Sequence, residues 1–374
     1  MKIYYVANAR MPNSKAHGIQ LAKMCEAFVA AGADLEFILP NKAKNGKSLK
    51  EFYGLKSDIK TKTLPVLDLL PETSVGFLVS AATFAFSSFF YLLFKADKNG
   101  IIYTIDLDPL SFMPLRLLGK PYFFESHGAK RKNFFTNLFI KNANGVVAVS
   151  PAIGESFKNN FNVKTEKIIV APNGSDTGFN QESKEEARRR LGLPLDKKII
   201  LYTGRFYHWK GLDILPEAGR RLRDDAEIYL VGGGAREFTE ATAAKPSENM
   251  RFAGSVPYRD ISLWLSAADI FLVLGTKKDE YSYFQTSPMK LFGYMAFSRP
   301  IIASATPAIR SAVSDQEVIF CEPDDSKDLA EKINEVLENP EKFAGRAQNA
   351  LKKAAELSWE KRAAKISDFI NQNL

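Results

Sequence analysis

Short apolar runs alternate along the chain with longer stretches in which apolar residues recur at helical spacing. Runs of strand length separated by helix-length segments predict parallel strands whose sheet is covered by helices on both faces. The first series of runs is 3–8, 35–40, 101–106, 122–126, 146–150 and 168–174, and the second is 198–204, 227–234, 250–256, 269–275, 300–304 and 318–323. The expected fold class is therefore α/β, with two parallel sheets.

The two series are separated by a polar segment, residues 175–184, which is followed by a short helical pattern at 185–191. A length of 374 residues also favours two or three domains over one. We therefore expect an N-terminal domain over residues 1–178 and a C-terminal domain over residues 179–362. Because ligands of parallel sheets bind beyond the carboxyl ends of the strands, we expect the functional residues in the loops that follow the strands.

The segment 285–304 contains a clear helix start between two strands. Ser287 suits the N-cap, and Pro288 suits the first helical position, where a missing N–H costs nothing. The N–H groups of Met289 and Lys290 then have no carbonyl of the helix to bond to. With the positive end of the helix dipole, these groups can bind an anion such as phosphate. The alternative is an ordinary capped helix.

A second candidate for anion binding follows the first strand of the second series. Gly204 and Gly211 flank Arg205 and Lys210 at the carboxyl end of that strand. Arginine supplies a planar fork and lysine a mobile point charge, so the pair can clamp a diphosphate while the glycines let the backbone approach. Two surface cations are the alternative, but the phosphate-type helix start on the same sheet edge favours the clamp.

The chain has three histidines, His17, His127 and His208, and each falls in a predicted strand-to-helix loop. His127 directly follows the strand at 122–126, which favours a role in ligand binding over a purely structural one. Gly18 lets a ligand approach the backbone, with an ordinary turn glycine as the alternative. Its loop is not a G-x-G-x-x-G sequence and does not predict dinucleotide binding.

Residues 75–94 carry no charge and would span about 30 Å as a helix. Small and polar residues form a stripe within about 80° of the helical wheel, which favours a helix packed against the sheet over one that crosses a membrane. A helix partly inserted in a membrane surface is a third alternative. The basic, aromatic segment 130–141 supports it, because Lys and Phe suit an anionic lipid interface. The stripe consists of Gly76, Ser80, Thr83, Ser87 and Tyr91.

The charge of the chain is unevenly distributed. Residues 1–180 hold 22 Lys and Arg and 14 Asp and Glu, whereas residues 181–374 hold 29 of each. The whole excess of +8 predicts an anionic partner for the N-terminal half, and without a nucleic-acid motif a membrane surface or an acidic substrate is expected. Cys25 and Cys321 lie far apart, and the first residues do not resemble a signal peptide. We therefore expect a cytoplasmic protein, peripheral on the inner face of the plasma membrane.

A set of motifs, in order along nearly the whole chain, resembles those of GT-B glycosyltransferases of the retaining family 4 type. The motifs are HGIQ (17–20), ESHG (125–128), APNGSD (171–176), GRFYHWKG (204–211), LVGGG (230–234), FAGSV (252–256) and SPMKLFGYMA (287–296). The resemblance implies two Rossmann-like domains that face each other across a cleft, with the last helix, residues 363–374, returning to the N-terminal domain. It implies sugar transfer from a UDP- or GDP-linked donor to a glycan or lipid-linked acceptor, with retention and without a metal or other cofactor. Cell-envelope polysaccharide biosynthesis is the expected context.

The same resemblance assigns roles to residues. Arg205 and Lys210 would neutralise the leaving diphosphate, and His127 would hydrogen-bond the transferred sugar, so these three are the expected catalytic residues. Gly18 would lie against the β-phosphate or the sugar, the helix-start amides would hold the α-phosphate, and the backbone near Val256 would meet the base. The expected donor-binding residues are Gly18, Val256, Gln285, Ser287, Met289, Lys290, Leu291 and Gly293.

Three positions depart from the family pattern. The family carries two glutamates eight residues apart, the first on the donor sugar and the second on the ribose, and here these positions are Gln285 and Gly293. Gln285 can still bond hydroxyl groups, whereas Gly293 cannot replace a carboxylate, and Asp279 or Glu280 could compensate. Ser298 stands where glycine is common. The alternatives are therefore a weak or inactive GT-B protein that binds a nucleotide sugar or scaffolds a pathway and, less favoured, a sugar-nucleotide epimerase.

Overall fold

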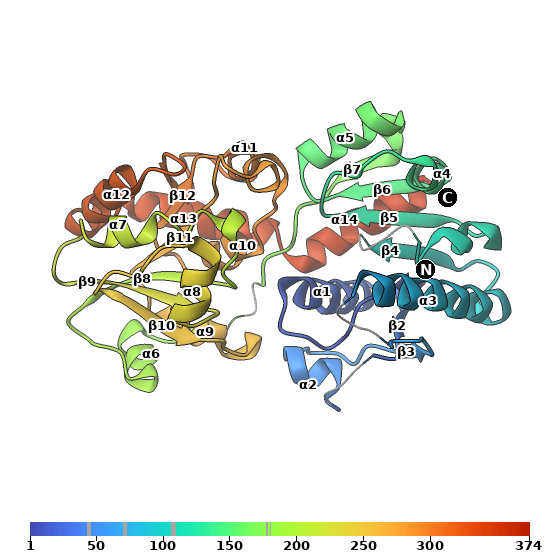
Figure 1. The fold of residues 1–374 in the computed structure, drawn as a ribbon, viewed down its shortest axis with the longest axis horizontal. Coiled ribbons are helices and arrows are strands. Elements are labelled where there is room, and N and C mark those ends of the chain that lie inside the picture. Colours follow the sequence, from blue (N-terminus) through green and yellow to red (C-terminus); the bar gives the residue numbers. More distant parts are fainter. Residues whose placement is uncertain (43–45, 70–72, 106–109, 177–178, 180) are drawn as a thin grey trace. The chain divides into compact units, whose positions relative to one another are not determined.

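The computed structural model describes residues 1–42, 46–69, 73–105, 110–176, 179 and 181–374. It divides into two compact units (Figure 1). Unit 1 consists of Met1–Pro172 together with Trp359–Leu374, and unit 2 consists of Asn173–Ser358. Each unit has its own parallel sheet and its own apolar core, so we describe them separately.

The sheet of unit 1 has seven parallel strands in the order β3-β2-β1-β4-β5-β6-β7. The strands are β1 (Lys2–Val6), β2 (Asp34–Pro40), β3 (Thr61–Leu64), β4 (Ile101–Ile105), β5 (Tyr122–Ser126), β6 (Gly145–Ala148) and β7 (Ile168–Val170). Every strand except β3 was predicted. The sequence TKTL of β3 lacks an apolar pattern because this edge strand buries only Leu64.

Side chains of β1 alternate between the two faces of this sheet. The Tyr5 ring contacts the rings of Phe28 and Tyr103 on one face, whereas Tyr4 joins an apolar cluster with Phe84 and Phe139 on the other. The helical segments of unit 1 are α1 (Ala16–Ala30), α2 (Leu49–Tyr53), α3 (Ser74–Lys95), η1 (Met113–Leu118), α4 (Phe134–Lys141), α5 (Pro151–Phe161), η2 (Thr165–Lys167) and α14 (Trp359–Gln372). Helices α1 and α14 lie against each other on the Tyr5 side, and α3, α4 and α5 contribute to the Tyr4 cluster.

The sheet of unit 2 has six parallel strands in the order β10-β9-β8-β11-β12-β13, and all six were predicted. The strands are β8 (Lys198–Thr203), β9 (Ala226–Val231), β10 (Met250–Gly254), β11 (Ile270–Val273), β12 (Ile301–Ser304) and β13 (Ile319–Cys321). The helical segments are α6 (Lys184–Leu191), η3 (His208–Lys210), α7 (Leu215–Gly219), α8 (Ala235–Thr242), η4 (Tyr258–Asp260), α9 (Ile261–Ala267), η5 (Tyr281–Gln285), α10 (Met289–Met295), α11 (Pro307–Arg310), α12 (Ser326–Glu338) and α13 (Pro340–Glu356).

Both sheets reverse their strand order beside the first strand of the unit, at β1/β4 in unit 1 and at β8/β11 in unit 2. Ligands of open parallel sheets bind outside the carboxyl ends of strands at such reversal points. The loop that follows β8, residues 204–211, therefore occupies the expected binding position of unit 2. In unit 1 the segment that follows β1 occupies the corresponding position.

Candidate functional site

A pair of lysines lies beyond the carboxyl end of β8 in unit 2. Gly204, directly after the strand, has φ of 120°, and a Cβ atom placed there would lie 3.3 Å from Nζ of Lys290. Glycine thus provides both the backbone conformation and the space that the lysine occupies. The Lys290 ammonium lies 3.4 Å from the centre of the Tyr202 ring. We call Lys210 and Lys290, with the Tyr202 and Trp209 rings, the lysine cluster.

Lys290 has a buried ammonium group with no hydrogen-bond partner among the described residues. Burial, together with the charge of Lys210, lowers the pKa of Lys290 well below its ordinary value. Attraction to the Tyr202 ring offsets part of this cost. A buried, unpaired cation destabilises a fold, and such a residue is typical of a functional site.

Lys210 ends the short segment η3, and its Nζ lies 3.8 Å from the centre of the Trp209 ring. Burial lowers the pKa of Lys210 to about 8. Within the described part of the chain, neither cluster lysine forms an ion pair with a carboxylate. A phosphate-type anion bound here would raise both pKa values, because an opposite charge favours the ammonium form.

We expect Lys290→Met to increase the stability of the protein without ligand and to weaken nucleotide binding. Methionine retains most of the packing volume and removes the unpaired charge, and relieving such strain raises the free energy of unfolding by about 0.5–2 kcal/mol. Thermal unfolding with and without a nucleoside diphosphate measures both effects. A variant that is less stable without ligand, or that binds as tightly as the wild type, would contradict the role assigned to Lys290.

The start of α10 differs from its prediction. The helix begins at Met289, and Pro288, with ψ of 99°, occupies the N-cap position. The Ser287 hydroxyl does not cap the helix. It accepts a hydrogen bond from the Asn173 N–H at 3.4 Å, and the Ser287 carbonyl accepts one from the Asn173 side chain at 3.3 Å. The predictions of Ser287 at the N-cap and Pro288 inside the helix are therefore wrong, because Asn173 holds Ser287 outside it.

The other predicted site residues of unit 2 lie in several separate segments. Arg205 is exposed in the loop after β8, Val256 follows β10 and is half-buried, and Gln285 ends η5. The Leu291 side chain is fully buried in the core, so only its backbone can meet a ligand. A Cβ atom at Gly293 would lie 3.9 Å from Phe179, an ordinary contact, so the position accepts a side chain.

The two residues considered as substitutes for the missing glutamates lie just before η5. Asp279 accepts a hydrogen bond from the Ser282 N–H at 2.8 Å and so helps to fix the start of this turn. Glu280 occupies the position before the first residue of η5. Ser298 has φ of 47°, in the left-handed region that favours glycine. This conformation explains why glycine is expected there.

Unit 1 contains a buried carboxylate at the end of β5. Glu125 is fully buried and accepts hydrogen bonds from Gln20 at 2.9 Å, from the Tyr103 hydroxyl at 2.5 Å and from Arg362 at 2.9 Å. Nε2 of His127 lies 2.7 Å from the same carboxylate. The Arg362 charge and the bond to His127 lower the pKa of Glu125 despite its burial. We call these five residues the glutamate network.

The glutamate network fixes the orientation of His127, the predicted catalytic residue of this unit. A histidine whose ring nitrogen bonds to a carboxylate is held in one orientation and one tautomer. The sequence placed Glu125 and Gln20 inside recognised motifs but gave neither a role, and it did not indicate Arg362. A charged residue at the end of an otherwise apolar strand was the available signal for Glu125.

His17 and Gly18 lie in the first turn of α1. Nε2 of His17 is buried without a hydrogen-bond partner among the described residues. The Gly18 N–H bonds to the Lys15 carbonyl at 2.9 Å, and a Cβ atom at Gly18 would lie 2.5 Å from the Tyr53 hydroxyl. The absent side chain of Gly18 thus makes room for Tyr53, and contact of Gly18 with a donor stays a prediction. His208, the remaining histidine, begins η3 and is exposed.

We expect the stability of unit 1 to fall as the pH decreases from 6.5 to 4. Burial and the charge of His127 lower the pKa of His17 to about 4, whereas an unfolded histidine titrates near 6.5. The unfolded chain therefore binds more protons in this window, and the loss for His17 amounts to about 3 kcal/mol at pH 4. Urea unfolding at several pH values measures it. His17→Phe should flatten the dependence between pH 6.5 and 4, and an unchanged slope would contradict the assignment.

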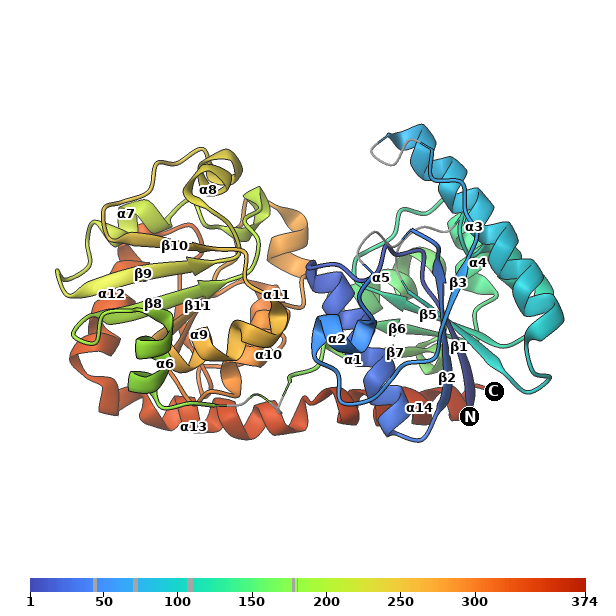
Figure 2. The ribbon, with the colours of Figure 1, turned by 90° about the horizontal axis from the view of Figure 1, so that it is seen from below.

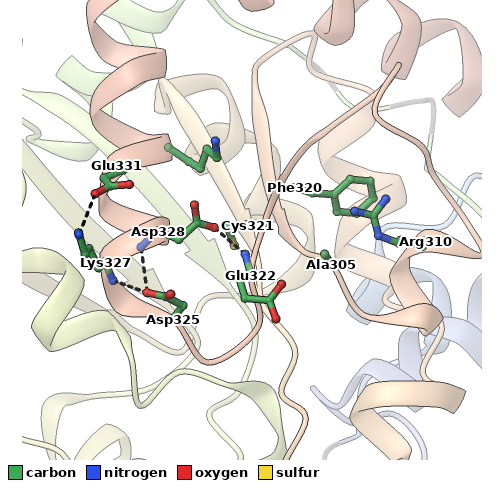
Figure 3. Close-up of a pocket in the computed structure, with 10 residues that line it drawn as sticks. Ala305, Arg310, Phe320, Cys321, Glu322, Asp325, Lys327, Asp328 and Glu331 are labelled. Carbon is green, nitrogen blue, oxygen red and sulfur yellow. Dashed lines mark hydrogen bonds and ion pairs between the residues drawn. The ribbon is translucent and has the colours of Figure 1, made fainter.

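A separate pocket lies beside the end of β13 and the start of α12, with a volume of about 520 Å³ (Figure 3). Several of its polar groups bond to one another. Asp325 accepts hydrogen bonds from the N–H groups of Lys327 and Asp328, and Asp328 accepts one from the Glu322 N–H. No predicted site residue lines this pocket, so it does not take part in the site described above.

The family of unit 2 follows from comparison with known proteins. Residues 183–356 match the family model described as glycosyl transferases group 1. Unit 2 belongs to this family. The matched segment contains the lysine cluster and, except for Gly18 and His127, all of the predicted site residues.

The other comparisons extend beyond unit 2. The chain is 28% identical over 194 residues to a Bacillus subtilis protein named for teichuronic acid biosynthesis, the glycosyltransferase TuaC, a match that covers 52% of this chain and 47% of TuaC. The chain thus spans about half the length of the curated relatives it matches. Sucrose-phosphate synthase from Thermosynechococcus elongatus superimposes with a TM-score of 0.79 at 20% identity, over 99% of this chain and 98% of that one. Anabaena Alr3699/HepE, solved with UDP-glucose, superimposes with a TM-score of 0.72 at 18% identity over both whole chains. These structures confirm the predicted GT-B fold class.

Proposed function

We propose that the protein transfers a sugar from a nucleoside diphosphate donor to a glycan or lipid-linked acceptor, with retention and without a required metal. The lysine cluster is the observation that carries this proposal. Two ammonium groups with lowered pKa values lie together at the reversal point of the unit 2 sheet, without a carboxylate partner among the described residues. A bound diphosphate would supply the negative charge that pairs with these two ammonium groups.

The chemistry follows from the change in charge during transfer. Negative charge accumulates on the diphosphate as its bond to the sugar breaks, so fixed cations stabilise the transition state more than the ground state. Lys210 and Lys290 supply those cations, and Arg205 is an exposed third on the same loop as Lys210. His127, oriented by Glu125, is proposed to hydrogen-bond hydroxyl groups of the transferred sugar.

Comparison with relatives supports the class of donor and acceptor. HepE was solved with UDP-glucose, and TuaC is named for teichuronic acid biosynthesis. We extend this chemistry to the present chain and propose a UDP- or GDP-linked donor, an acceptor in cell-envelope polysaccharide synthesis, and a cytoplasmic location on the inner face of the membrane.

Release of the nucleoside diphosphate tests the function. UDP-glucose and a series of other UDP- and GDP-sugars are incubated with the protein and with membrane extracts as acceptor source, and UDP or GDP is quantified. The proposal predicts release with one nucleotide class that rises when acceptor is added, and a product whose anomeric configuration matches that of the donor. Absence of release with every donor, with and without acceptor, would contradict it.

Gly293 supports the second candidate function, a binding protein with weak or no turnover. A glycine in α10 cannot provide the carboxylate that would contact a ribose, although the position has space for one. We expect Gly293→Glu to tighten nucleoside diphosphate binding about tenfold, because hydrogen bonds to charged groups contribute about 1.5–3 kcal/mol. Gly293→Ala controls for the gain in helix propensity, about 1 kcal/mol. Calorimetric titration of both variants measures the difference, and equal affinities would show that no ribose contact forms here.

A further inference from the structure

Helix α3 of unit 1 presents an apolar face to solvent. Five large apolar side chains within about 120° of the helical wheel form this outer face of α3. They are Val75, Leu78, Phe86, Phe90 and Leu93, with exposed fractions of 64%, 54%, 62%, 51% and 50%. Figure 2 shows the helix running beside β3 along the outside of the unit 1 sheet. A contiguous apolar surface of this kind marks an interaction site.

The opposite side of α3 is fixed to unit 1. The Ser87 hydroxyl donates to the Pro65 carbonyl at 2.7 Å, the Tyr91 hydroxyl donates to Glu36 at 2.9 Å, and Phe84 is fully buried in the core. The small and polar stripe therefore faces the protein, as the packed alternative predicts. By length and composition α3 could cross a bilayer, but crossing would break these contacts. Its geometry suits a helix that lies in the plane of an interface.

The elements that adjoin α3 carry basic residues. Segment η1 packs against α3, and α4 packs against η1. Residues 74–98, 110–120 and 130–141 together hold eight Lys and Arg and a single acidic residue, Asp97. Arg131 and Lys132 are exposed just before Phe134 and Phe135, which are 73% and 62% exposed. Apolar and basic side chains thus occur on neighbouring surface elements.

We propose that unit 1 docks on an anionic lipid bilayer through the outer face of α3, with the flanking basic residues at the headgroups. Each basic residue near an anionic surface contributes about 1 kcal/mol, and the aromatic side chains enter the interface. A second copy of the chain suits this face less well, because a symmetric contact would bring its basic residues together. Docking needs no nucleotide, so its test is independent of the proposed transfer activity.

Flotation of the full chain with vesicles tests the proposal. Vesicles of equal parts phosphatidylglycerol and phosphatidylcholine are compared with vesicles of phosphatidylcholine alone. We expect binding to the anionic vesicles that weakens with salt, and release of the protein by alkaline carbonate. Phe86→Ser with Phe90→Ser should weaken binding at least tenfold, and Arg131→Gln with Lys132→Gln about 30-fold at low salt. The control, Leu195→Ser, alters an apolar residue of unit 2 that is 54% exposed and should have no effect.

Several results would overturn the proposal. Equal binding to neutral and anionic vesicles would show that the basic residues do not contribute to docking. Unchanged binding of the variant with Phe86→Ser and Phe90→Ser would show that the outer face of α3 is not the docking surface. Resistance to carbonate would indicate a spanning helix. Sedimentation as a dimer that the phenylalanine substitutions dissociate, without vesicle binding, would identify the face as a contact between copies. Circular dichroism of each variant shows that a loss of binding is not a loss of fold.

Discussion

Replacement of Lys210 by alanine should lower kcat/KM for the nucleotide sugar by roughly 10–150-fold, because a charge-assisted hydrogen bond contributes about 1.5–3 kcal/mol. Part of this loss should appear in kcat, since the diphosphate gains charge as the sugar bond breaks. The free energy of unfolding should change little or rise, because the substitution removes a cation whose pKa is lowered by burial.

A matched control distinguishes the role of Lys210 from a general loss of positive charge. Lys327→Ala removes an exposed lysine of α12 that forms only a surface ion pair with Glu331 at 3.8 Å. Lys327 lies outside the lysine cluster, so this variant should keep kcat/KM within twofold of the wild type. Its stability should also change little, because such surface pairs contribute about 1 kcal/mol or less. Equal losses of activity in the two variants would show that Lys210 acts only through the overall positive charge of unit 2.

Replacement of Arg362 by alanine should destabilise unit 1 by about 3–5 kcal/mol, the usual cost of removing one partner of a buried ion pair. The Arg362 guanidinium is buried, bonds to Glu125 at 2.9 Å and donates to the Pro172 carbonyl at 2.8 Å. Its removal leaves the fully buried Glu125 carboxylate without its cation. Lys365→Ala, on an exposed part of the same helix, is the control and should cost less than about 1 kcal/mol.

Urea unfolding can report on unit 1 alone. The chain has three tryptophans, and only Trp359 belongs to unit 1. In a background with Trp209→Phe and Trp264→Phe, fluorescence therefore follows the unfolding of this unit. A midpoint for Arg362→Ala equal to that of Lys365→Ala would show that the ion pair does not stabilise the unit.

The sequence was sufficient for the strands because parallel buried strands are nearly continuous apolar runs. It was insufficient for β3, whose edge position buries a single residue, and for the start of α10, where Asn173 bonds to Ser287 from a distant part of the chain. The stripe on α3 predicted which side of that helix packs inward, since its small and polar residues do contact the fold.

The candidate site was predictable only where its residues are close in sequence. Lys210 follows its strand within one loop, so its position could be inferred from the pattern. The side chain of Lys290 was not identified, because its burial depends on the space left by Gly204 and on the ring of Tyr202. The glutamate network likewise joins α1, β4, β5 and α14, and no local pattern in the sequence predicts such a set.

Calorimetric titration of UDP and GDP, and of the corresponding monophosphates, into the wild type and into Lys210→Ala tests the central claim most directly. We expect one diphosphate to bind at one site per chain, at least tenfold more tightly than its monophosphate, and the variant to lose this preference. Absence of binding by both diphosphates, or a preference that survives in Lys210→Ala, would show that the lysine cluster is not a diphosphate site.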